Sequence, residues 1–185
     1  MLQDAKRIEK FVWIDLEMTG LDPQRDVILE IATIITEPTL EIIAYGPQLV
    51  IAQPAAVLAT MVPEVRAMHE KHGLLDAVTT SSTSLEDAYR QTFDFIQQQC
   101  KKNEAVLCGN SIWQDRQFLA AYMPSIVSFL NYRLVDVSAI KVLINKWYPK
   151  NANGKFKKAE THRAFEDIKQ SIAELQHYRT HFFVE

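Results

Sequence analysis

The stretch that decides the fold is FVWIDLE, residues 11–17, which runs into the turn-forming sequence TGLDP at 19–23. Its apolar character predicts a buried strand that ends at this turn. Side chains two positions apart on a strand point to the same face, so Asp15 and Glu17 project together while Leu16 points to the opposite face. Two adjacent carboxylates repel each other, and their pKa values rise unless a cation lies between them. Two interpretations follow: a site for a hard cation such as Mg²⁺ or Mn²⁺, or a solvated strand edge.

The rest of the chain predicts an α/β domain built outward from this strand. Further strands are expected at 27–36 and 40–51, joined by short turns that are typical of an antiparallel meander. Residues 54–73 have weak periodicity and predict a mixture of loop and short helix. The second half predicts, in order, a helix at 85–102 capped by Ser84, a strand at 105–109, a helix at 115–122, a strand at 132–136, a helix at 137–147 and a helix from about 161 to 181. This order predicts a mixed β-sheet flanked by α-helices, in one domain over residues 1–185.

Composition excludes several classes of protein. The 185 residues are 48% apolar and 23% charged, which is ordinary for a globular chain of one domain. A net charge of −3 argues against tight binding to long nucleic acid, because neutralising many phosphates needs a basic face. We expect a cytoplasmic protein with no membrane partner, because no apolar run approaches the roughly 18 residues of a membrane span and the first residues lack an apolar signal segment. Cys100 and Cys108 are expected to be buried free thiols.

Two more acidic motifs follow later in the chain. Asp115 ends the sequence NSIWQD, directly after the strand expected at 105–109, and ligands gather at strand ends in α/β sheets. It is either a ligand or a helix-capping aspartate. His162 and Asp167 are five residues apart and do not share one helical stripe, so we expect His162 at the helix start, leaning over the site, and Asp167 pointing into it. His162 is either a general base beside a metal-bound water or a surface histidine.

The order of these motifs resembles the histidine-containing branch of the DEDD exonuclease superfamily: Asp-x-Glu on the first strand, Asp after a later strand, and His-x-x-x-x-Asp at the last helix. Within that superfamily the chain is most similar to the oligoribonucleases. The stretches that carry this similarity are WIDLEMTGL at 13–21, CGNS at 108–111, YR at 132–133, DVS at 136–138 and TH at 161–162. The resemblance extends from residue 11 to about residue 182.

This resemblance implies a ribonuclease H-like fold and a homodimer that removes 5′-mononucleotides from the 3′ end of very short RNA, down to dinucleotides. It also implies two divalent cations per active site, Mg²⁺ or Mn²⁺, which activate the attacking water and stabilise the leaving 3′ oxygen. Carried onto this chain, the metal ligands would be Asp15, Glu17, Asp115 and Asp167, and the general base would be His162.

The same resemblance assigns residues that select short substrates. Leu21 matches a leucine that wedges between the two bases, and Ser111, Arg133 and Ser138 match residues that cap the 5′ phosphate. A guanidinium pairs bidentately with phosphate, which suits Arg133 to this role. His69 and Tyr132 match further cap residues, contributed at least in part by the dimer partner. A cap at the 5′ phosphate would prevent longer RNA from passing through.

The chain departs from the oligoribonuclease pattern at two positions. Glu64 stands where the family carries a tryptophan, five residues before the cap histidine, and Trp113 stands where the family carries a small residue. Both departures bear on the shape of the substrate pocket and neither falls on a catalytic position.

Two alternatives to a short-RNA exonuclease follow from the same residues. A DNA-directed exonuclease, such as a proofreading domain, would share the catalytic motifs, but the stretch MTGL at 18–21 argues against it. A non-catalytic module that senses short RNA would tolerate the loss of a metal ligand or of His162, and none of these is lost. Lys155, Lys157 and Lys158 are either a solvated loop or a cluster that helps to neutralise substrate phosphate.

Overall fold

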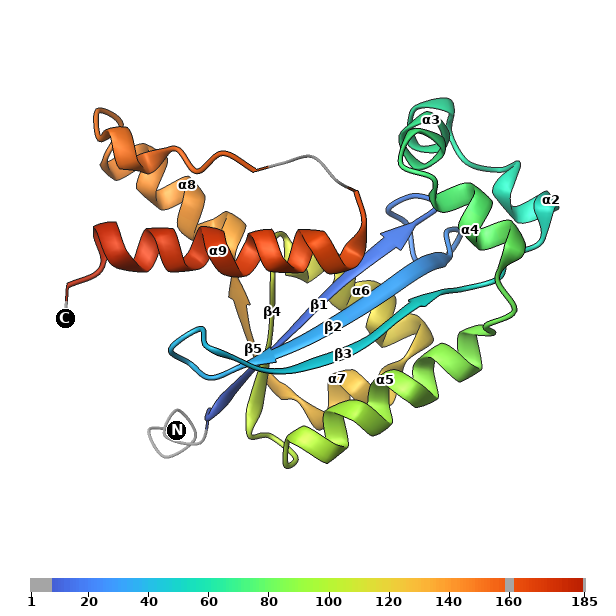
Figure 1. Cartoon of the computed structure of the whole chain (residues 1–185), viewed down its shortest axis with the longest axis horizontal. Coiled ribbons are helices and arrows are strands. Elements are labelled where there is room, and N and C mark those ends of the chain that lie inside the picture. Colours follow the sequence, from blue (N-terminus) through green and yellow to red (C-terminus); the bar gives the residue numbers. More distant parts are fainter. Residues whose placement is uncertain (1–7, 159–161, 185) are drawn as a thin grey trace.

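The computed structural model describes residues 8–158 and 162–184, which contain a five-stranded mixed sheet of order β3-β2-β1-β4-β5 (Figure 1). The antiparallel meander that the sequence predicts is confirmed: β1 (Lys10–Met18) pairs with β2 (Ile28–Thr36), and β2 pairs with β3 (Ile42–Val50). On its other side β1 pairs in parallel with β4 (Ala105–Gly109), which pairs in parallel with β5 (Asn131–Asp136). β1 therefore lies at the centre of the sheet.

Helices cover both faces of the sheet, as Figure 1 shows. One face carries α5 (Leu85–Gln99), α6 (Ile112–Tyr122) and α7 (Pro124–Phe129). The other face carries α8 (Val137–Trp147) and α9 (Ala164–Phe182), with the short η1 (Ala152–Gly154) between them in the chain. Three short helices follow β3 and lie near the carboxyl end of β1: α2 (Ala55–Leu58), α3 (Pro63–Lys71) and α4 (Leu74–Thr80). Within the described ranges, no helix has the length and apolar character to cross a membrane.

The alternation of side chains along β1 divides them between the two cores. Ile14 and Leu16 pack into the cluster that includes residues of α5, α6 and α7. Trp13 is fully buried in the other cluster, with Ile168 and Leu175 of α9. Because residues two apart share a face, Asp15 and Glu17 follow Trp13 onto the face covered by α9. This alternation places both carboxylates where the last helix begins.

Several element boundaries differ from the sequence expectation. The helix expected at 115–122 begins at Ile112, because Ser111 adopts a left-handed φ of 50° and turns the chain earlier. Asp115 is therefore inside the first turn, and its interpretation as a helix cap is wrong. Pro124 ends α6 and starts α7, since its missing N–H costs nothing at a first helical position. The last helix begins at Ala164 rather than at about 161, a residue outside the described ranges.

Candidate active site

A pocket of about 360 Å³ opens at the carboxyl ends of β1 and β4, beside the start of α9. Parallel strands carry their carboxyl ends to one edge of the sheet, and loops that follow them converge there. The pocket is lined by all the catalytic residues that the sequence suggests: Asp15, Glu17, Asp115, His162 and Asp167. Residues separated by up to 152 positions in the chain are thus brought into one cavity.

Asp115 is held against β1 by a backbone hydrogen bond. Its Oδ1 accepts from the Leu16 amide at 3.0 Å, and the side chain is only 7% exposed. The close approach of β4 to β1 depends on Gly109, because a Cβ there would lie 2.8 Å from the Ile112 Cδ1 and 3.2 Å from the Ile14 carbonyl oxygen. This contact brings the loop that leads into Asp115 alongside the Asp15 and Glu17 strand.

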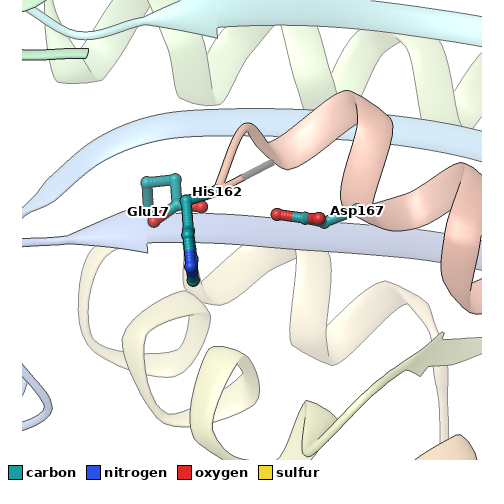
Figure 2. A group of neighbouring side chains, drawn as sticks. All are labelled: Glu17, His162 and Asp167. Atoms are coloured by element: carbon teal, nitrogen blue, oxygen red, sulfur yellow. The ribbon is translucent and has the colours of Figure 1, made fainter. Parts of the chain in front are cut away.

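Three of the pocket residues form a compact group that could hold a cation. Figure 2 shows Glu17 on β1 together with His162 and Asp167, which come from the entry to α9 and its first turn. One ligand atom from each of the three lies within 4.8 Å of the other two. Carboxylate oxygens are the ligands that Mg²⁺ and Mn²⁺ prefer, so the Glu17 and Asp167 carboxylates fit a hard divalent cation, and the His162 imidazole lies beside them.

The carboxyl groups in this pocket have strongly raised pKa values. Burial raises the pKa of Glu17 to about 8, with further contributions from the negative charges of Asp167 and Glu30. Burial also raises the pKa of Asp115 to about 7. The pKa of Asp15 lies well above its usual range, because it is desolvated and close to Asp115 and Glu17. Lys158 and Arg163 lower the pKa values of Asp15 and Glu17 without cancelling the increase, and such like-charge crowding is typical of a metal site.

His162 lies two residues before α9 rather than on it. Its backbone has a left-handed φ of 45°, and its ring contacts the ring of His72, with centroids 5.0 Å apart. As the sequence suggests, His162 and Asp167 both line the pocket, although His162 reaches it from the connection that precedes the helix.

Of the residues expected to cap a 5′ phosphate, Ser111 and Ser138 meet at the start of α8, whereas Tyr132 and Arg133 lie near the beginning of β5. The Ser111 and Ser138 hydroxyls are hydrogen-bonded at 3.2 Å, and Asp136 accepts from the backbone amides of both serines at 3.0 and 2.9 Å. The Arg133 guanidinium stacks over the Tyr132 ring at 4.5 Å, and the Tyr132 side chain is 68% exposed. Of these residues, Ser111 lines the same pocket as the carboxylates.

The two remaining substrate-binding candidates have opposite environments. Leu21 is 70% exposed, and its carbonyl accepts a hydrogen bond from Gln114 Nε2 at 2.7 Å. His69 is fully buried: its Nε2 lies 2.8 Å from the Met18 carbonyl oxygen, and its Nδ1 lies 3.8 Å from Glu17 Oε2. Burial lowers the pKa of His69 below its ordinary value. In this conformation His69 therefore lies directly beside the Glu17 carboxylate.

The two departures from the family pattern are both at helix starts. Glu64 is in the first turn of α3, which is the helix that carries His69. Trp113 is in the first turn of α6, two residues before Asp115, and it is 55% exposed. Trp113 therefore does not crowd the interior of the loop that positions Asp115.

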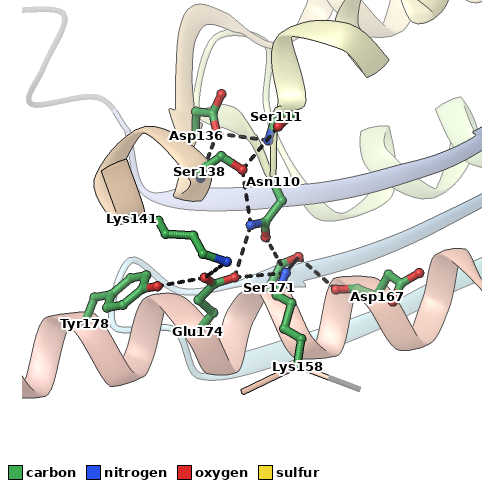
Figure 3. A network of polar contacts seen from close by, with 10 residues as sticks. All are labelled: Asn110, Ser111, Asp136, Ser138, Lys141, Lys158, Asp167, Ser171, Glu174 and Tyr178. Atoms are coloured by element: carbon green, nitrogen blue, oxygen red, sulfur yellow. Dashed lines mark hydrogen bonds and ion pairs between the residues drawn. The ribbon is translucent and has the colours of Figure 1, made fainter. Parts of the chain in front are cut away.

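A largely buried polar network, drawn in Figure 3, extends from the Asp167 backbone carbonyl, which accepts from Ser171, to the Ser111–Ser138 pair. Its centre is Glu174 on α9, a fully buried side chain that pairs with Lys158 at 2.9 Å and Lys141 at 3.1 Å. The Lys158 ammonium also donates to Asn110 Oδ1 at 2.8 Å, and Asn110 Nδ2 donates to the Ser138 hydroxyl at 3.3 Å. Lys158 is thus an internal partner rather than a solvated lysine.

Sequence reasoning missed the buried acids that support the site, Glu30 and Glu174. Glu30 sits inside the isoleucine-rich strand β2, every residue of which is buried. Glu174 falls on the apolar stripe of α9, next to Leu175 and one turn before Tyr178. A charged residue inside an otherwise apolar strand or stripe was the available signal, because such a group is seldom buried without a partner.

Comparison with known proteins places this geometry among nucleases. A family model described as exonuclease matches residues 12–175. The oligoribonuclease of Shewanella frigidimarina is 49% identical over 183 residues, covering 99% of each chain. The fold is similar to Pop2p of S. pombe in its Mg²⁺- and Mn²⁺-bound form, with a TM-score of 0.69 at 13% identity, covering 98% of this chain and 88% of that one.

A second solved structure agrees on the fold. The exonuclease I of Methylocaldum szegediense has a TM-score of 0.65 at 20% identity, covering 94% of this chain and 41% of that one. The ribonuclease H-like arrangement expected from the sequence is confirmed by these neighbours. The full-length similarity, together with the matching exonuclease family, establishes that this chain is a phosphodiester-hydrolysing nuclease and belongs to the oligoribonuclease family.

Proposed function

We propose that this protein is a metal-dependent 3′→5′ exoribonuclease that hydrolyses dinucleotides and very short oligoribonucleotides to 5′-mononucleotides. The observation that carries the proposal is the convergence of Asp15, Glu17, Asp115, Asp167 and His162 on one pocket, with the Ser111 hydroxyl at its wall. The oligoribonuclease relatives support the choice of short RNA over other nucleic acids.

The metal requirement follows from the charge of the pocket. The ligands would be Asp15, Glu17, Asp115 and Asp167, which we propose hold two divalent cations, and the Mg²⁺- and Mn²⁺-bound form of Pop2p supports cations of this class. When bound, divalent cations supply the positive charge that activates water and stabilises the leaving 3′ oxygen. Without positive charge, the raised pKa values of Glu17 and Asp115 oppose their ionisation at neutral pH.

His162 is the proposed general base. Its ring lies beside the Glu17 and Asp167 carboxylates, and its backbone precedes the first residue of α9. In this position a neutral imidazole nitrogen accepts the proton of the attacking water as the water oxygen bonds to phosphorus and the bond from phosphorus to the 3′ oxygen breaks. The leaving 3′ oxygen takes up a proton from solvent to become a hydroxyl. The His162 imidazolium is then stabilised by the adjacent carboxylates until it releases the proton to solvent.

Selection of short substrates is assigned to the residues around Ser111. We propose that Ser111, Ser138 and Arg133 bind the 5′ phosphate, and that the exposed Leu21 wedges between the two bases. A dinucleotide offers few phosphates, which agrees with a net charge of −3 and with the absence of any need for a long basic track. Tyr132 completes the cap in this proposal, and a cap role for His69 would require it to leave the buried position beside Glu17 that this structure shows.

We also propose a cytoplasmic homodimer in which the partner contributes Tyr132. Tyr132 on β5 and Val142 and Trp147 on α8 are large apolar side chains that are all more than half exposed, which supports a protein–protein interface on this side of the molecule. Bound in this way, Tyr132 would reach the active site of the other subunit.

The catalytic assignment is tested by Asp115→Ala. Removing this carboxylate is expected to abolish turnover of a diribonucleotide, since Asp115 is both a ligand and a contact of β1. The matched control is Asp94→Ala, which removes an exposed carboxylate on α5. Chelation with EDTA should abolish wild-type turnover and added Mn²⁺ should restore it. Wild-type-like turnover by Asp115→Ala would refute its role as a ligand.

A further inference from the structure

His162 occupies a left-handed backbone conformation, which residues other than glycine adopt only rarely. Its φ of 45° lies in the left-handed region, where a Cβ crowds the following carbonyl. Residues persist in such conformations at functional sites only when the surrounding structure fixes them. The contacts made by the next residue in the chain, Arg163, provide that constraint.

Arg163 forms a bidentate ion pair with a carboxylate on β2. Its Nε lies 3.2 and 3.1 Å from the two Glu30 carboxylate oxygens, and its Nη2 lies 2.8 Å from Glu30 Oε1. Glu30 Oε2 also accepts from the Ala164 backbone amide at 3.2 Å, which satisfies one of the free N–H groups at the start of α9. Glu30 is 3% exposed, so the pair is protected from water on the Glu30 side. The Glu30 carboxylate therefore binds both residues that follow His162, namely Arg163 and Ala164.

The position of Glu30 links this ion pair to the catalytic group. In the β1–β2 ladder, Glu30 is the residue directly opposite Glu17. The sheet therefore fixes the distance between the Arg163 anchor and the Glu17 carboxylate, and His162 is one peptide bond away from that anchor. The Arg163 guanidinium also lies close enough to lower the pKa of Glu17, partly offsetting the repulsion between Glu17 and Glu30.

We propose that Glu30 and Arg163 are positioning residues, whose bidentate pair holds His162 in its left-handed conformation beside Glu17 and Asp167. This inference rests on the proposed function, in which His162 accepts a proton. The geometry of the pair is the essential property, because an ammonium in place of the guanidinium keeps the charge and loses the two-pronged contact. A small displacement of a catalytic group lowers the rate of the chemical step without weakening substrate binding to the same degree.

The test compares Arg163→Lys, Glu30→Gln and the double variant with two matched controls. Arg90→Lys alters an exposed arginine paired with Asp87, and Glu166→Gln alters an exposed carboxylate in the first turn of α9. We expect kcat on a diribonucleotide with Mn²⁺ to fall by about tenfold or more in each single variant, with KM and Mn²⁺ affinity changed by about twofold or less. The double variant should be no slower than the slower single variant, because both changes break one contact. The control variants should keep the wild-type kcat.

A second measurement uses metal-free protein and does not depend on activity. The backbone NMR shifts of His162 should leave the values of a left-handed residue in Arg163→Lys, while the thermal unfolding midpoint shows that the chain remains folded. Folded variants with wild-type kcat, or with unchanged His162 shifts, would overturn the proposal. If instead the wild-type protein cleaves no dinucleotide while the shifts still move, the proposed function fails and the positioning of His162 by Glu30 and Arg163 stands.

Discussion

Burial of the Glu17 side chain destabilises the folded protein at neutral pH, because it removes an acidic group from water. The side chain is 8% exposed, it faces Glu30 across the ladder, and burial raises its pKa to about 8. In the unfolded chain the same carboxyl group ionises near its ordinary value, about 4.3. The folded protein therefore binds more protons than the unfolded chain between these two pH values.

This difference predicts how the stability of the metal-free protein varies with pH. A raised pKa in the folded state means that unfolding releases protons, so the free energy of unfolding falls as the pH rises from about 5 to about 8. Asp115, with its pKa raised to about 7, contributes in the same direction. Thermal unfolding in the presence of EDTA at a series of pH values measures the effect.

Two controls make this pH experiment decisive. Glu17→Gln removes one titrating group and should flatten the dependence of the unfolding midpoint on pH. Mn²⁺ competes with protons for the same oxygens and should stabilise the protein more at about pH 8 than at about pH 5. A metal-free protein whose stability rises over this range would contradict the assignment of a crowded cluster of buried carboxylates with raised pKa values.

Among the helices and strands, most of those that the sequence predicts were predicted from the periodicity of their apolar residues. The alternation around Asp15 and Glu17 predicted a buried strand with both carboxylates on one face, because strand geometry is local, whereas its central place in the sheet came from the structure. The start of α6 was not predictable in this way, since Ser111 turns the chain through a left-handed conformation that its residue type does not indicate. The short helices α3 and α4 were also not fully predicted, because their apolar residues pack on Leu29 of the sheet rather than repeating clearly along the chain.

The supporting partners of the site could not be derived from sequence. Lys158 and Glu174 are 16 positions apart and meet because the connection before α9 folds back against that helix. Likewise, Glu30 and Arg163 are separated by 133 positions. The proposed catalytic residues were identified through their motif spacing, whereas these partners depend on the tertiary path of the chain.

Glu174 leads to a prediction about the stability of α9. Burial alone would raise its pKa, but hydrogen bonds from Lys158 and Tyr178 lower the pKa below its ordinary value. Glu174→Ala leaves Lys158 without its carboxylate and is expected to cost about 3 kcal/mol of unfolding free energy, toward the lower end for a broken buried ion pair because Lys141 is partly exposed. Urea denaturation measures this loss.

The matched control for Glu174 lies on the same helix. Glu166 pairs with Lys169 in an exposed contact of 3.1 Å, so Glu166→Ala should change the unfolding free energy by about 0.5 kcal/mol or less. Equal losses in the two variants would show that the network around Glu174 contributes no more than a surface ion pair.

At the scale of the whole molecule, the proposed homodimer predicts that two inactive variants regain activity when their subunits are mixed. Inactive Asp115→Ala chains mixed with inactive Tyr132→Ala chains should regain activity, because one of the two sites in each mixed dimer has an intact carboxylate group and an intact partner tyrosine. Random exchange of subunits predicts about a quarter of the wild-type activity. Each variant exchanged only with itself is the control, and no recovery in the mixture would count against capping by Tyr132 across the dimer.

The most direct test of the account is a time course on a 5′-labelled diribonucleotide and an RNA of about seven nucleotides, side by side with Mn²⁺. We expect fast cleavage of the dinucleotide to mononucleotides and slow cleavage of the longer RNA, because the proposed 5′ phosphate cap, which includes the Ser111–Ser138 pair, would exclude a continuing strand. Comparable rates on both would contradict the proposed cap and direct attention to Glu64 and Trp113. Cleavage of neither substrate with metal present would contradict the proposed exoribonuclease activity itself.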